Sequence, residues 1–173
     1  MYIIKNIFTE EERKKLIENA TPFLLDGKKL NMFYDGEEGE YHEGFEWFKL
    51  SHSTLHQVPK FNFWHQYLVE KIKEETNLDL KITKSWINLT NGKRHSKNIK
   101  WHNHDWDGAD YAGVYYMKTL PLINSGTMFK DKFVRAPQNS LLLFPASLNH
   151  TAPKSPFRFS RYTLSLDLVD SRR

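Results

Sequence analysis

The second half of the sequence is a series of short apolar segments separated by turn-forming residues, and this pattern constrains the fold more than any other feature. Residues 80–90 (LKITKSWINLT) alternate apolar and polar side chains, which is typical of a half-buried strand. Further segments with strand character cover residues 112–117, 126–130, 133–136, 140–145 and 161–169. Asn-Gly and Pro-containing stretches lie between them. About six to eight short strands in this arrangement predict a β-sandwich or barrel.

The first half of the sequence predicts helices that flank this β core. Thr9 followed by Glu12 is a capping-box signature, so a helix should begin there and end near Thr21-Pro22. Residues 61–76 have the apolar periodicity of a second helix. Its apolar stripe consists of Phe61, Trp64, Leu68 and Ile72. The fold class expected from these patterns is therefore mostly β with flanking helices, the helices packed on one outer face of a two-sheet core.

We expect residues 1–173 to form a single domain, because this length suits one hydrophobic core. Residues 1–80 supply an N-terminal strand and the supporting helices, and residues 81–170 supply the β core. Residues 31–44 are rich in glycine and acidic residues and are predicted to form a long loop. A short strand is expected at residues 45–50.

Composition restricts the chemistry and the compartment. The sequence contains no cysteine, which excludes disulfides and thiolate ligands, so a bound metal would have to use His, Asp or Glu. No apolar run approaches the roughly 20 residues that span a bilayer, and the N-terminus lacks the pattern of a secretory signal. A cytoplasmic protein without a membrane partner is therefore expected. The formal charge of +4 is small, and the basic residues 93–100 indicate either a solvated loop or a rim that attracts an anion.

Three histidines have the spacing expected of a metal site. His102 and His104 are two residues apart, and side chains at this spacing lie on the same face of an extended strand. His150 follows the apolar segment LLLFP at the end of another predicted strand. Three imidazoles that leave open positions on the ion are a ligand set suited to iron. We therefore predict a metal site formed by His102, His104 and His150.

A carboxylate remains an alternative third ligand. Asp105 would have to join the histidines through a bulge or turn, because it alternates with them on a regular strand. Asp107 is a second candidate for the carboxylate ligand, or would instead orient a ligand imidazole through a hydrogen bond. The remaining histidines have no partners at metal-ligand spacing and are interpreted as structural: His42, His52, His56, His65 and His95.

The last predicted strand carries a candidate anion site. Arg161, Thr163 and Ser165 alternate in the segment RYTLSL and should share a face. The planar guanidinium group binds a carboxylate through paired, charge-assisted hydrogen bonds, to which a threonine hydroxyl can add another. A buried arginine requires an anion, which would be either a ligand or an internal acid such as Asp167.

Taken in order, these segments resemble the double-stranded β-helix core of the 2-oxoglutarate/Fe(II)-dependent oxygenases, in particular the prolyl 4-hydroxylase-like and small bacterial or phage branches. The N-terminal strand and helix are similar to the start of that group more loosely. The third position of the sequence HNH is histidine, whereas the family usually has aspartate there. The segments that carry the resemblance are SWINLTNG (85–92), WHNH (101–104), AGVYYM (112–117), SGTMFKD (125–131), APQNSLLLFPASLNH (136–150) and Arg161-Tyr162-Thr163.

The resemblance implies a jelly-roll fold and two cofactors, Fe(II) and 2-oxoglutarate. His102 or His104 would be the first metal ligand and His150 the distal one, while Arg161, assisted by Thr163, would hold the far carboxylate of 2-oxoglutarate. Asn88 and Tyr115 would line the same pocket. The implied activity is that of a dioxygenase that hydroxylates its substrate and releases succinate and CO2. Side chains expected to shield the mouth of the site are Trp101, Trp106 and Tyr111.

Two other functions fit the same residues. A cupin-like metalloenzyme would use the three histidines without 2-oxoglutarate, and a metal-free β-sandwich would serve as a binding module. The expected partner is a small-molecule or peptide substrate. A nucleic acid lacks support, because the basic residues 93–100 are not interleaved with aromatic side chains.

Overall fold

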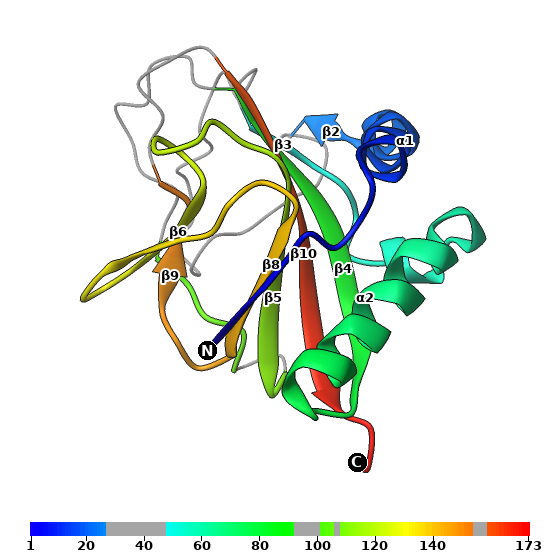
Figure 1. Cartoon of the computed structure of the whole chain (residues 1–173), viewed down its shortest axis with the longest axis vertical. Helices are drawn as coiled ribbons and strands as arrows, with labels where there is room; N and C mark the ends of the chain where they lie inside the picture. The colour runs from blue at the N-terminus through cyan, green and yellow to red at the C-terminus, as the bar shows by residue number, and fades with distance from the viewer. Residues whose placement is uncertain (27–47, 92–100, 106–107, 154–158) are drawn as a thin grey trace.

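A computed structural model of the protein describes residues 1–26, 48–91, 101–105, 108–153 and 159–173 (Figure 1). The predicted loop at residues 31–44, the basic residues 93–100, Trp106 and Asp107 lie outside the described residues. No helix in the described part of the chain is both long and apolar enough to cross a membrane.

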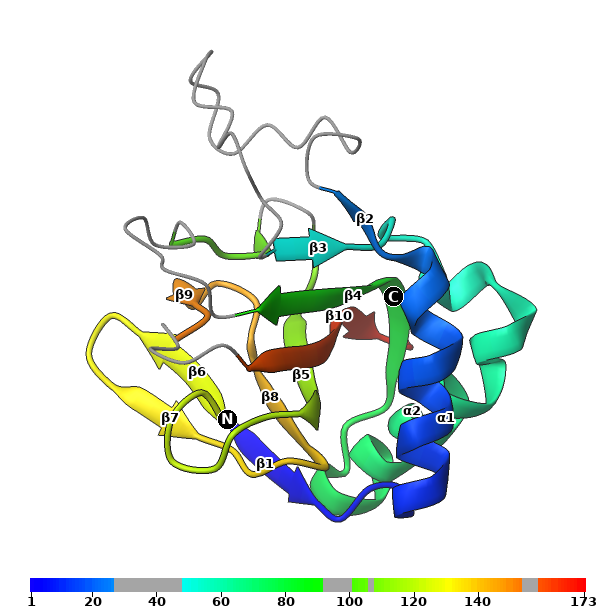
Figure 2. The ribbon, with the colours of Figure 1, turned by 90° about the horizontal axis from the view of Figure 1, so that it is seen from above.

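The described strands form two antiparallel sheets. The larger sheet has seven strands in the order β1-β8-β5-β10-β4-β3-β2, and the smaller has three in the order β7-β6-β9. Figure 2 shows the smaller sheet beside one face of the larger one, with the helices at the opposite side. The strands of the larger sheet are β1 (Tyr2–Lys5), β2 (Leu25–Asp26), β3 (Phe48–Leu50), β4 (Leu80–Asn91), β5 (Tyr111–Lys118), β8 (Ser140–Pro145) and β10 (Ser160–Asp170). Those of the smaller sheet are β6 (Gly126–Phe129), β7 (Phe133–Arg135) and β9 (His150–Thr151).

The helices begin and end at the residues that carry the sequence signals. Helix α1 (Glu10–Ala20) begins at the capping box formed by Thr9 and Glu12, as predicted, and the 3-10 turn η1 (Thr21–Phe23) follows it. Helix α2 (Asn62–Thr76) is preceded by the 3-10 turns η3 (Leu55–Gln57) and η4 (Pro59–Phe61). It ends at Asn77, which has the left-handed conformation often found at this position.

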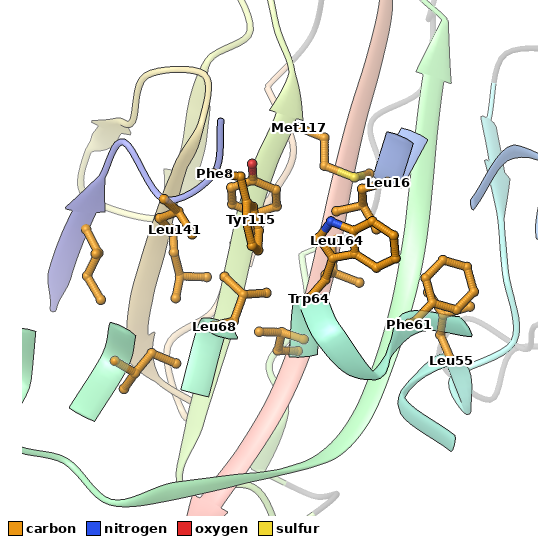
Figure 3. Packing of buried hydrophobic residues seen from close by; sticks show 14 of the residues in the cluster. Phe8, Leu16, Leu55, Phe61, Trp64, Leu68, Tyr115, Met117, Leu141 and Leu164 are labelled. Carbon is orange, nitrogen blue, oxygen red and sulfur yellow. The ribbon is translucent and has the colours of Figure 1, made fainter. Parts of the chain in front are cut away.

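Both helices pack against one face of the larger sheet. Leu16 of α1 and Trp64 and Leu68 of α2 meet side chains from β5, β8 and β10, such as Tyr115 and Leu164 (Figure 3). All these residues are almost completely buried. The apolar stripe predicted for residues 61–76 is thus the surface that attaches α2 to the sheet.

Strand β10 separates two different environments. Leu164, Leu166 and Leu168 point into the helix-covered core, so the alternating residues Thr163, Ser165 and Asp167 face the smaller sheet. On β5, the residues directly opposite these three are Tyr116, Val114 and Ala112, which belong to a second apolar cluster. This cluster also contains Phe129 of β6 and Phe144 of β8, so it fills the space between the two sheets.

Candidate metal and anion site

The three predicted metal ligands converge between the two sheets. One potential ligand atom from each of His102, His104 and His150 lies within 4.8 Å of the other two. Two nitrogens bound to one ion at about 2.1 Å each are at most about 4.2 Å apart, so small ring rotations suffice for all three to bind one metal. Within the described residues, this is the group of His, Asp and Glu side chains close enough to hold an ion. The residues present therefore fit a metal.

Backbone hydrogen bonds bring these histidines together. The amide of His102 donates to the carbonyl of His150 at 3.1 Å, and the amide of His150 donates back at 2.9 Å. The amide of His104 donates to the carbonyl of Ala146 at 2.9 Å. His150 is also paired with Phe129 of β6, so the bridge between His102 and His150 extends the smaller sheet by one residue. Residues 101–105 form this bridge rather than the longer strand that the sequence suggested.

Burial keeps the His150 ring neutral. His150 lies against Phe144, with ring centroids 4.8 Å apart, and its Nδ1 is 3.0 Å from the carbonyl oxygen of Leu148. An Nδ1–H that donates to this carbonyl leaves the Nε2 lone pair available. Desolvation, with a smaller contribution from the nearby His102, lowers the pKa of His150 to about 3. A neutral imidazole is the form that binds metal.

His104 has a stacking partner and an acidic partner. Trp86 of β4 stacks on its ring at a centroid distance of 5.5 Å and an interplanar angle of 29°. The Nδ1 of His104 lies 2.9 Å from Oδ1 of Asp167 on β10. Neither Trp86 nor Asp167 was assigned to the metal site from the sequence. Strand alternation is the signal that points to both. Trp86 is two residues from Asn88 and Asp167 is two residues from Ser165, so each shares a strand face with a residue of the predicted sites.

Arg161 is buried between the sheets without an acidic partner among the described residues. Its Nε donates to the carbonyl of Asn124 at 2.9 Å, and one terminal nitrogen donates to the carbonyl of Gly126 at 3.1 Å. Its Cζ lies 5.5 Å from the centroid of Tyr116. Burial lowers the pKa of the guanidinium below its usual value, although Tyr116 opposes this. The internal ion pair with Asp167, considered from the sequence, does not form, because Asp167 contacts His104 instead.

Polar side chains line the same face as Arg161. Thr163 lies directly opposite Asn88 in the register of β10 and β4, so the two share a face. The amide Nδ2 of Asn88 donates to Oγ of Ser165 at 2.8 Å. The charged fork of Arg161, with only carbonyl oxygens as its hydrogen-bond partners among the described residues, fits the carboxylate of a dicarboxylic acid.

The structure places two predicted site residues on the other face of β5. Tyr115 lies in the helix-covered core, where its hydroxyl donates to Oδ1 of Asn139 at 2.8 Å, and it cannot line the space around Arg161. Tyr111 packs against the same core and does not shield the metal site. Both corrections follow from strand alternation, which turns the odd-numbered residues of β5 toward the helices and gives the position beside Arg161 to Tyr116.

The other predicted site residues lie outside the histidine cluster. Asp105 is exposed and does not belong to the group that can hold a metal. Trp101 precedes His102 and is 39% exposed, so its ring is available at the surface beside the site.

Solved structures with the same fold include enzymes described with 2-oxoglutarate bound or as dependent on it. HygX from Streptomyces hygroscopicus, with nickel and 2-oxoglutarate bound, matches with a TM-score of 0.63 and 11% identity over 98% of this chain and 82% of its own. The α-ketoglutarate-dependent epimerase SnoN from nogalamycin biosynthesis matches with a TM-score of 0.71 and 10% identity over 98% and 78%. A prolyl hydroxylase from Trichoplax adhaerens, in complex with a hypoxia-inducible factor peptide, matches with a TM-score of 0.65 and 17% identity over 99% and 84%.

These similarities establish the fold. The chain has the jelly-roll fold of the 2-oxoglutarate-dependent enzymes, with helices on one sheet, and the predicted double-stranded β-helix core is confirmed. No protein-family model and no curated protein sequence matches the chain.

Proposed function

We propose that the protein is a 2-oxoglutarate- and Fe(II)-dependent oxygenase that hydroxylates a small-molecule or peptide substrate. One observation carries the proposal: a cluster of three imidazoles and a buried guanidinium, with no acidic partner among the described residues, both lie between the two sheets. A metal ion alone would explain the histidines, and an internal acid would explain the arginine. A dicarboxylate that chelates the metal with one end and meets the guanidinium with the other explains both groups.

The chain supplies the binding groups and the surroundings. His102, His104 and His150 hold the metal, and Arg161 holds the far carboxylate of 2-oxoglutarate with help from Thr163 and Asn88. When bound, iron and 2-oxoglutarate supply the oxidising chemistry, in which succinate and CO2 are released and a substrate C–H bond is hydroxylated.

The aromatic side chains around the histidines exclude water from this site. Phe144 and Phe129 pack against His150, and Trp86 covers His104. His102 is the least buried of the three histidines, which marks the side from which a substrate approaches. Trp101, exposed on that side, is positioned to contact it.

Among the residues that the structure describes, no carboxylate belongs to the histidine cluster, and this favours one second candidate. A cupin-like metalloenzyme uses three histidines without 2-oxoglutarate, and Arg161 would then bind a substrate carboxylate. The solved structures that share the fold favour the oxygenase, because HygX is described with 2-oxoglutarate bound and SnoN as dependent on it.

A thermal-shift series with Mn(II), which binds like Fe(II) but resists oxidation in air, separates the two candidates. A ligand at 100 times its Kd stabilises the native state by about 2.7 kcal/mol, or about 5–10 °C for a chain of this size. The oxygenase predicts one increase with Mn(II) and a further increase with 2-oxoglutarate. The cupin-like enzyme predicts the first increase alone, and a metal-free binding module predicts neither.

Succinate release from 2-oxoglutarate in the presence of Fe(II) tests the reaction itself. We expect slow release by the wild type without a substrate, and none by His150→Ala or Arg161→Ala. The matched controls are His52→Ala and Arg135→Ala, two exposed residues whose loss should leave release unchanged. Failure of the wild type to bind 2-oxoglutarate and to release succinate with iron present would overturn the proposal.

A further inference from the structure

Asp167 is a buried carboxylate whose side chain has a single polar contact among the described residues. Its side chain is 1% exposed, and Oδ1 lies 2.9 Å from Nδ1 of His104. Neither carboxylate oxygen has an aligned hydrogen bond from any described group, so the contact with His104 is electrostatic in the present geometry. Lys84 lies directly opposite on β4 but makes no hydrogen bond to these oxygens. The carboxylate is therefore directed at one imidazole.

Such an arrangement is costly unless it serves the imidazole. Removing an ionised carboxylate from water costs several kcal/mol, which one misaligned contact does not return. The neighbouring positions on this face carry no charge: Ser165 has a hydroxyl group that is hydrogen-bonded to Asn88, and Ala112 has a methyl group. Fold stability alone gives no reason for an acid at this position.

We propose that Asp167 is a positioning residue for the metal site: it holds the proton of His104 on Nδ1 and so turns Nε2 of that ring toward His102 and His150. A histidine that binds metal commonly donates its second N–H to a carboxylate, which fixes the tautomer and makes the ligand more basic. The sequence HNH lacks the carboxylate ligand usual in the family that the chain resembles. Asp167 supplies a negative charge that contacts the ligand His104 instead of the metal itself. The inference rests on the metal site of the proposed function.

The geometry of β10 explains how one strand serves both cofactors. Arg161, Thr163, Ser165 and Asp167 alternate along a single face, so the anion-binding group lies at the start of the strand and the carboxylate near its end. Arg161 and Asp167 are six positions apart on the strand, about 20 Å along the backbone. The two opposite charges are thus kept apart and each remains available to a different group.

Co(II) titration of the purified metal-free protein tests this role, with the visible absorption of bound Co(II) as the signal. The variants are Asp167→Asn and Asp167→Ala, and the matched control is Asp170→Asn, which changes the same charge at an acid paired with Arg172. We expect Asp167→Ala to weaken Co(II) binding by about 10–100-fold and to change the spectrum. Asp167→Asn, whose uncharged amide oxygen is able to accept a hydrogen bond from Nδ1, should bind with intermediate affinity, and Asp170→Asn should match the wild type.

Melting of the metal-free variants, followed by circular dichroism, separates positioning from folding. A cooperative transition in Asp167→Asn together with weaker Co(II) binding supports the inference. Co(II) affinity and spectrum equal to those of the wild type in a folded Asp167→Asn and Asp167→Ala would overturn it, and the metal site itself would stand. Absence of Co(II) binding by the wild type would instead refute the proposed function and this inference with it.

Discussion

His102 and His150 face each other across two reciprocal backbone hydrogen bonds, 3.1 and 2.9 Å long. An antiparallel pair of this kind holds its Cα atoms about 5.5 Å apart and places both side chains on the same side. The two rings accordingly lie 4.4 Å apart between centroids. Their proximity is a property of the backbone, so the pair is preorganised for a metal.

Loss of any one of the three histidines should abolish tight metal binding. Each of His102→Ala, His104→Ala and His150→Ala is expected to weaken Mn(II) binding by more than about 100-fold, which exceeds the effect of removing a group behind a ligand. Asp105→Ala should bind Mn(II) like the wild type, because Asp105 is exposed and outside the cluster. Isothermal titration calorimetry measures all four. Retained binding in His104→Ala with loss in Asp105→Ala would assign the third ligand to the aspartate.

The guanidinium of Arg161 should determine affinity for 2-oxoglutarate but not for the metal. Arg161→Lys keeps the positive charge and loses the planar fork, so one or more charge-assisted hydrogen bonds are lost. We expect 2-oxoglutarate to bind about 10–100-fold more weakly to the Mn(II)-saturated variant, with Mn(II) affinity unchanged. Arg135→Lys, on the exposed side of β7, is the control. Equal 2-oxoglutarate affinity in Arg161→Lys and the wild type would count against this anion site.

Gly126 should be indispensable because its backbone conformation and its surroundings both exclude a side chain. Its φ is 149°, and a Cβ would lie 2.3 Å from the carbonyl oxygen of Val134. Gly126→Ala should lower the free energy of unfolding by about 2–4 kcal/mol, measured by urea denaturation. It should also weaken 2-oxoglutarate binding, since the carbonyl of Gly126 holds Arg161.

Gly108 provides the matched control for this substitution. Its φ is 73°, but a Cβ there would meet no atom of the described residues within 4 Å. Gly108→Ala therefore carries only the backbone strain, about 1–2 kcal/mol. A destabilisation of Gly126→Ala no larger than that of Gly108→Ala would show that the close approach of Val134 is relieved elsewhere.

His65 should make the metal-free protein less stable in acid. Its Nε2 is buried and has no hydrogen-bond partner in the part of the chain that the structure describes, and desolvation lowers its pKa from about 6.5 to about 4. As the pH falls through this range, the unfolded chain binds a proton that the native state does not. The free energy of unfolding therefore decreases toward low pH, by up to about 3 kcal/mol from this residue.

Urea denaturation at pH 7.0, 5.5 and 4.5 in the presence of a chelator measures this effect. His65→Gln should reduce the pH dependence, while the exposed His52→Gln should leave it unchanged. An unaltered slope in His65→Gln would mean that the buried ring is protonated without cost. His150, whose pKa is lowered to about 3, adds a contribution of the same sign and accounts for part of the slope that remains.

The local patterns predicted most elements because their signals are short in range. The capping box at Thr9 and Glu12 and the apolar stripe of residues 61–76 depend on neighbours within one or two helical turns. Alternation placed Arg161, Thr163 and Ser165 on one strand face, which the structure shows. On β5 the same alternation distinguishes Tyr116, beside Arg161, from Tyr115 in the helix-covered core.

The available chemical groups can be read from the amino-acid order alone: three histidines that can bind a metal, one arginine on an alternating strand face, and no cysteine. Their partners depend on the folded chain, in which Asp167 lies behind His104 and the carbonyls of Asn124 and Gly126 accept hydrogen bonds from Arg161. The physical reason is that these contacts depend on the register between strands and on the packing of two sheets. Many contacts between residues far apart in the sequence together stabilise this register, and no short stretch of sequence encodes the register.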